Sequence, residues 1–130
     1  MAEVVVFADA AQHAANYLRP LLGVTTVAKI PTPRPTTFVT VQRVGGVNRN
    51  RVVDSANLDI QCWAGADYIA HDLAQTAWAY LRALDGGGYM DGVFCYRCDT
   101  IGGPAYLPDP DSTQPRYVMA VELSLRGTPI

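Results

Sequence analysis

Hydrophobic and polar residues alternate most regularly between Arg51 and Trp63. The apolar positions of this stretch are Val52, Ala56, Leu58, Ile60 and Cys62, and only Asp54 interrupts them. Residues 116–126 repeat the pattern, with Tyr117, Met119, Val121, Leu123 and Leu125 on one face. Strict alternation predicts strands with one buried and one solvated face, as in an antiparallel sheet.

Three further segments are rich in β-branched residues and predict strands at 24–30, 36–44 and 93–101. Prolines at 31, 33 and 35 predict a stiff, extended connector between the first two strands. Gly45 and Gly46 are expected to end the second strand, and residues 48–50 to form a loop tip.

Residues 66–84 show the apolar spacing of a long amphipathic helix, with Asp67 as its expected cap and Gly86–Gly88 as its end. The stripe consists of Ile69, Ala70, Leu73, Ala77, Tyr80, Leu81 and Leu84. A first helix is predicted from Asp9, a favourable N-cap, to about Leu18, because Pro20 should end or kink it.

These elements predict a single α+β domain over residues 1–130. We expect two layers: a mainly antiparallel sheet of about four to five strands, packed by one long helix plus the N-terminal helix. Two loops stand out as arm-like, residues 43–51 and residues 102–116. The second is long and rich in proline, which is typical of a functional loop.

Composition narrows the possible functions. The chain has 130 residues, of which 49% are hydrophobic and 17% charged, so it is not disordered as a whole. A net charge of −2 lacks the basic excess that drives phosphate binding. No targeting signal or membrane span is expected. An odd number of cysteines, 3, favours reduced intracellular thiols.

The cysteines and histidines are candidates for a catalytic or metal site. Cys95 and Cys98 have C-x-x-C spacing, and Cys62 with His71 or His13 could in principle complete a zinc site. A second knuckle is missing, however, and on a strand a separation of three should place the two sulfurs on opposite faces. We therefore predict ordinary thiols, no metal, no cofactor and no catalytic residues.

The two loops carry the remaining candidate residues. Asp99, Asp109 and Asp111 could gather around a hard cation, but acids next to proline more often form turns. Arginines around the first loop favour a salt-bridged hairpin or subunit contact over nucleic-acid recognition. The predicted interaction residues are Arg43, Arg49, Arg51, Tyr106, Leu107, Asp109, Asp111 and Arg116.

Several segments resemble the tail terminator (tail-completion) proteins of long-tailed, siphovirus-type phages, especially those infecting actinobacteria. The similar segments are FVTVQRVGG (residues 38–46), LDIQCWA (58–64), AHDLA (70–74), GGPAYLPDP (102–110) and QPRY (114–117). They follow the expected order over most of the chain, whereas the first 30 residues add only a helix in the expected place.

The resemblance implies a structural protein without enzymatic activity that forms a hexameric ring. Such a ring caps the head-proximal end of the tail tube, stops tube polymerisation and joins the tail to the head-neck connector. DNA passes through the lumen without sequence recognition. The implied location is the tail-neck junction of the virion, after assembly in the host cytoplasm.

Two alternatives remain open on the sequence alone. One is another head-tail connector, such as a head-closure protein. The other belongs to a different class, a small cytosolic ligand-binding domain or enzyme that uses Cys95, Cys98 and His71.

Overall fold

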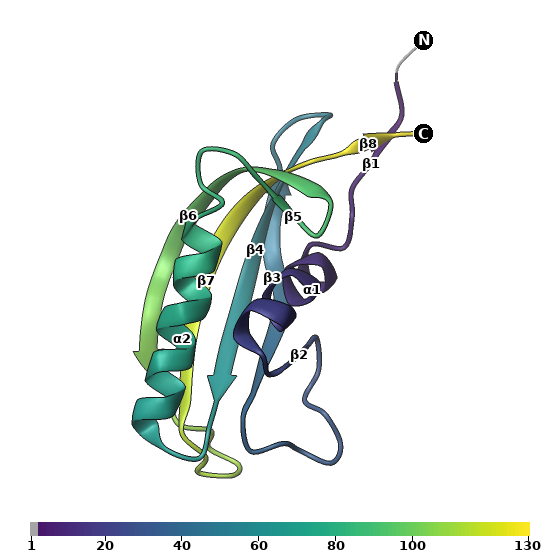
Figure 1. Cartoon of the computed structure of the whole chain (residues 1–130). Helices are drawn as coiled ribbons and strands as arrows, with labels where there is room; N and C mark the ends of the chain where they lie inside the picture. Colours follow the sequence, from purple (N-terminus) through teal and green to yellow (C-terminus); the bar gives the residue numbers. More distant parts are fainter. Residues whose placement is uncertain (1–2) are drawn as a thin grey trace.

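A curled sheet of six strands forms the body of the protein, and the computed structural model describes residues 3–130 of the chain (Figure 1). The strand order is β2-β3-β4-β7-β6-β5, and only β2 and β3 pair in parallel. The strands are β2 (Thr25–Val27), β3 (Phe38–Asn48), β4 (Val53–Trp63), β5 (Gly88–Met90), β6 (Val93–Tyr106) and β7 (Arg116–Arg126). Two shorter strands, β1 (Val5–Val6) and β8 (Thr128–Pro129), form a separate antiparallel ribbon near the chain ends.

The predicted architecture, a mainly antiparallel sheet of about four to five strands packed by one long helix plus the N-terminal helix, is wrong. The protein is mostly β, with 45% strand and 23% helix, and the sheet is larger and more curved than expected. Two causes explain the difference. β5 is only three residues long, too short to show a period, and the glycines at 45–46 and 102–103 lie inside long strands, where they accompany shifts of register.

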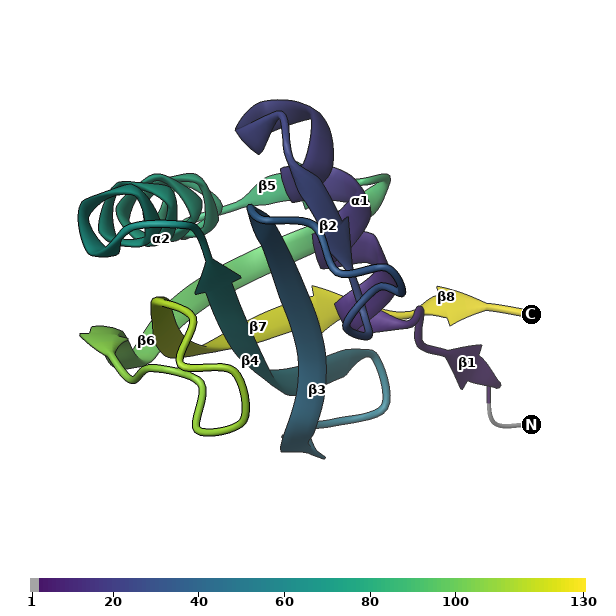
Figure 2. The same cartoon turned by 90° about the horizontal axis from the view of Figure 1, so that it is seen from below.

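Both helices lie on the same face of the sheet (Figure 2). Helix α1 (Ala10–Leu22) begins at Asp9 as predicted, because the Asp9 carboxylate accepts a hydrogen bond from the Gln12 N–H at 3.2 Å. The helix continues through Pro20 instead of ending there. It ends at Gly23, whose left-handed backbone lets its N–H donate to the Arg19 carbonyl.

Helix α2 (Asp67–Arg82) covers the other half of the same face. Its N-cap is Ala66, which offers no side-chain hydrogen bond, so the predicted cap at Asp67 is one position off. Asp67 lies in the first turn instead, where its negative charge is favourable near the positive end of the helix dipole. Leu84, expected in the last turn, follows the helix and is buried.

The main core fills the space between the helices and the sheet. Alanines line the buried side of both helices, so the helix backbones approach the strands closely. The core residues include Ala14, Ala15, Leu18, Val39, Val41, Leu58, Ile60, Cys62, Ala74, Ala77, Leu81, Met119, Val121 and Leu123. Each fully buried large aliphatic side chain contributes roughly 1.5–3 kcal/mol.

A second, smaller apolar contact lies on the opposite face of the sheet. Phe38 and Trp63 are stacked there, with ring centroids 4.5 Å apart and exposures of 0% and 1%. Arg34 and Arg116 place their guanidinium groups over these rings. The segments that follow β2 and precede β7 therefore cover part of the face that no helix covers.

The bulge between β3 and β4 depends on Gly46. The residue has φ +117°, and a Cβ on it would meet the Ser55 carbonyl oxygen at 2.0 Å. The register of β3 against β4 shifts between Arg43 and Gly45, so the outer part of the hairpin depends on this close approach.

We predict that Gly46→Ala destabilises the protein by about 2 kcal/mol or more, through both the strained φ and the backbone clash. Gly102→Ala is the matched control, because its Cβ would meet nothing within 4 Å. The control should stay within about 0.5 kcal/mol of the parent. Urea unfolding measures both variants, and equal effects would contradict the role given to Gly46.

Candidate interaction surfaces

The first predicted loop is the exposed end of the β3–β4 hairpin. β2 pairs only with Phe38–Thr40, so β3 from residue 42 onward is a free edge of the sheet in the described structure, and residues 42–52 are all exposed. β3 continues to Asn48, and the turn itself is only residues 49–52. A free strand edge that carries exposed apolar side chains is a common site of protein association.

The arginines of this hairpin have different roles. Arg43 holds Asp54 with two hydrogen bonds of 2.6 and 2.9 Å, and Asp54 is 4% exposed, so this pair is structural. Arg49 donates to the Ser55 hydroxyl and lies 3.3 Å from Glu122. Arg51 is exposed in the turn and has no ion-pair partner among residues 3–130. Of the three arginines of this hairpin, Arg51 is thus the one without an ion-pair partner in the described structure.

The second predicted loop is shorter than expected and lies at the opposite end of the sheet (Figure 1). β6 runs to Tyr106, so residues 102–106 are strand and only residues 107–115 form the loop. Glycines 102 and 103 had suggested a loop, yet neither needs a positive φ, and β6 accommodates them with irregular pairing to β7. The two candidate loops therefore do not form one site.

Asp109 holds the 107–115 loop in shape. It is 6% exposed and accepts hydrogen bonds from Arg34 at 3.0 Å, from the Ser112 hydroxyl at 2.6 Å and from the Asp111 N–H at 3.2 Å. The Ser112 and Arg34 hydrogen bonds lower the pKa of Asp109 to about 2. Asp109 is therefore a structural carboxylate and is not exposed to a partner, contrary to the sequence-based expectation.

Some of the other predicted residues around this loop form structural hydrogen bonds, and others are exposed. Arg116 donates to the Leu107 carbonyl at 2.8 Å and so closes the base of the loop. Tyr106 belongs to β6 and donates to the Asp67 carboxylate at 3.3 Å. Leu107 is 52% exposed and Asp111 is also exposed, so both side chains are accessible to solvent.

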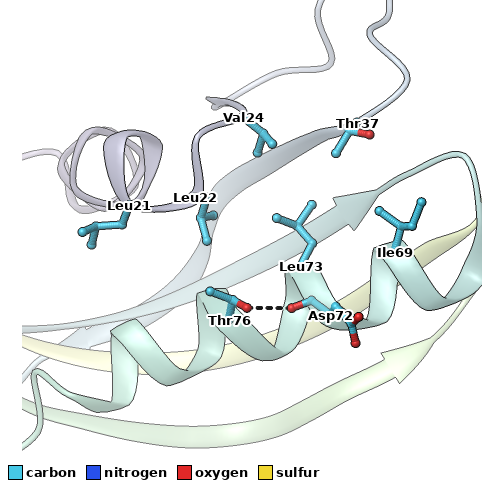
Figure 3. A pocket seen from close by; sticks show the side chains of 8 residues that line it. All are labelled: Leu21, Leu22, Val24, Thr37, Ile69, Asp72, Leu73 and Thr76. Carbon is cyan, nitrogen blue, oxygen red and sulfur yellow. Dashed lines mark hydrogen bonds between the residues drawn. The ribbon is translucent and has the colours of Figure 1, made fainter.

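A third surface, absent from the sequence prediction, is a groove between the helices (Figure 3). The cavity has a volume of about 320 Å³, and aliphatic side chains from the end of α1 and the first half of α2 face it. Its lining residues are Leu21, Leu22, Val24, Thr37, Ile69, Asp72, Leu73 and Thr76. We name this surface the helix groove.

The sequence contained only a partial signal for the groove. Ile69 and Leu73 belong to the predicted apolar stripe of α2, and such a stripe normally faces the core. In the structure Ile69 is 40% exposed and lines the groove together with Leu21 and Leu22 of α1. Only the relative placement of α1 and α2 shows that these residues line a surface.

The residues of the enzymatic alternative do not form a site in the described structure. Cys95 and Cys98 both lie in the main core, because an irregularity between Cys95 and Arg97 turns the two side chains to the same face of β6. The expectation of opposite faces is therefore wrong. Burial raises the pKa of Cys95 to about 11 and that of Cys98 to about 12, so neither is an activated thiol.

His71 is exposed on α2, where it pairs with Asp72 at 3.0 Å. Within residues 3–130, no group of three or more His, Cys, Asp or Glu side chains is placed to hold a metal ion. Neither described helix is long and apolar enough to cross a membrane.

Comparison of the chain with protein-family models and with curated proteins finds no match.

The Asp109 network predicts an acid-dependent loss of stability. Because the folded pKa lies below the ordinary value of 3.8, Asp109 stabilises the fold above pH 4, and this contribution is lost as pH falls towards 2. We expect Asp109→Asn to lower the urea midpoint at pH 7 and to reduce its fall between pH 4 and pH 2. Asp111→Asn, in the same loop but exposed, is the control and should keep the parent profile.

Proposed function

We propose that this chain is a structural subunit of a phage tail, a tail terminator that assembles into a hexameric ring. The ring caps the head-proximal end of the tail tube, stops its polymerisation and joins the tail to the head-neck connector. DNA passes through its lumen without sequence recognition. Its place is the tail-neck junction of the virion.

The observation that carries the proposal is the agreement between the family resemblance and the distribution of exposed surfaces. The segments that resemble tail terminators include the outer β3 strand and the start of the 107–115 loop, and the structure has these at opposite ends of one sheet. A cyclic assembly with head-to-tail contacts needs two different patches on each subunit. The chain offers distinct exposed surfaces for such contacts.

Rigid loops also suit a docking role. The 107–115 loop is held by Asp109, Arg34 and Arg116, so binding through Leu107 or Asp111 costs little ordering entropy. DNA must move through the proposed lumen without binding tightly to its wall. A net charge of −2 is compatible with weak attraction between the chain and DNA. The buried, protonated thiols favour this structural role over the enzymatic alternative.

Native mass spectrometry of the purified chain, alone and with tail-tube protein, tests the proposal. We predict a six-fold assembly, either of the chain alone or only as a cap on the tube. Binding to a portal-side adaptor with no response to tube protein would instead indicate a head-closure protein. A monomer or dimer that ignores both partners would contradict a role at the tail-neck junction.

A further inference from the structure

We infer that the helix groove receives the β3–β4 hairpin end, residues 43–52, of a second copy of this chain. This contact deepens the proposed function and rests on it, since it supplies the subunit contact of the ring. The groove and the hairpin end would together form one head-to-tail interface.

The chemistry of the groove suits aliphatic side chains of a protein better than a polar small molecule. Its wall is formed mainly by Leu21, Leu22, Val24, Ile69 and Leu73. Thr76, on its polar side, already donates its hydroxyl to the Asp72 carbonyl at 2.8 Å. A small-molecule site normally adds a few unsatisfied polar groups that orient the ligand.

Such unsatisfied groups lie elsewhere in the described structure. The buried polar side-chain atoms without a hydrogen-bond partner are Asn57 Oδ1, Trp63 Nε1 and Ser124 Oγ. Register places these three residues on the face of the sheet that carries no helix. The groove therefore has apolar surface to bury and no buried polar atom to satisfy.

The hairpin end carries the matching side chains. Val44 is 62% exposed, Val47 is 65% exposed, and Val52 is also exposed. The turn is rigid, because the Asn50 carboxamide oxygen accepts hydrogen bonds from the N–H groups of Val52 and Val53 at 2.9 and 3.0 Å. Exposed valines on a preformed turn can enter an apolar groove at low entropic cost.

Charge complementarity favours this hairpin over the 107–115 loop as the occupant of the helix groove. Asp72 lines the groove, and its side chain is 77% exposed. Arg51, next to Val52 in the turn, is exposed without an ion-pair partner in the described part of the chain. The 107–115 loop would bring Asp111 towards Asp72, which is unfavourable.

The distance between the hairpin end and the groove within one subunit requires a heterologous contact, in which two different surfaces of neighbouring subunits meet. Val47 pairs with Ser55 near the start of β4, whereas Ile69 lies in the first turn of α2, just beyond the end of β4. Ser55 and the last residue of β4, Trp63, are roughly 26 Å apart at about 3.3 Å per residue. A subunit therefore cannot insert its own hairpin, and it can give its hairpin to one neighbour while it receives that of another.

An engineered disulfide tests this contact. We would place Val47→Cys and Ile69→Cys in one chain and oxidise it with and without tail-tube protein. The two positions are too far apart for a bond within one subunit. Cys62, Cys95 and Cys98 are buried, so the engineered thiols are the reactive ones in the folded protein. We expect a ladder of covalently linked oligomers of this chain.

Val47→Cys with Tyr89→Cys is the matched control, since Tyr89 is 65% exposed on β5 and outside the groove. The control should give at least tenfold less cross-linked product. Equal cross-linking of both pairs would overturn the inference. The inference would also be overturned if the chain assembled into a ring and no disulfide formed between positions 47 and 69. That result would leave the proposed function standing.

Charge exchange gives a second readout. We expect Arg51→Glu and Asp72→Arg each to reduce oligomer formation at least tenfold, and the double variant to restore it. Failure of the double variant to restore assembly would count against the pairing. Cross-linking through the groove without any binding to tail-tube protein would support this contact and contradict the terminator function.

Discussion

The unbroken pairing of β4 with β7 is the constraint on which the rest of the structure depends. All eleven residues of each strand pair in register, from Val53 with Arg126 to Trp63 with Arg116, without a bulge. One face of this ladder carries Leu58, Ile60 and Val121 into the main core. A one-residue slip would turn these side chains to the opposite face, so the hydrophobic pattern fixes the register.

The strands on either side of this ladder are less regular, and their irregularity creates the exposed surfaces. β3 and β6 both change register against their inner neighbours, and each continues beyond its short outer partner, β2 or β5. The β3–β4 hairpin end is therefore exposed at one end of the sheet and the 107–115 loop at the other. The regular centre and the less regular outer strands thus leave both ends of the sheet exposed.

The sequence predicted the regular parts and failed where tertiary context decides. Alternation located β4 and β7, and Asp9 located the start of α1, because these signals are local. Gly45 and Gly46 predict the end of a strand but lie inside β3, since local rules cannot distinguish a strand end from a bulge within a strand. The parallel pairing of β2 with β3 also has no local signal.

The candidate site shows the same division. Asp109 lies in a proline-rich segment that is typical of an exposed turn. It is structural because it pairs with Arg34, which is 75 residues earlier in the chain. Cys95 and Cys98 share a face only because β6 bulges between them. The helix groove is lined by residues from both α1 and α2. Each of these features depends on contacts between segments far apart in sequence.

Hydrogen exchange measured by mass spectrometry, on the chain alone and on the chain bound to tail-tube protein, tests the central claim most directly. We propose that this chain is a structural subunit that associates through its hairpin end, its helix groove and its 107–115 loop. We expect amides in residues 42–52, 69–76 and 107–115 to become protected in the assembly, while the β4–β7 ladder is protected in both states. Unchanged exchange in all three segments on assembly, or no assembly at all, would contradict it.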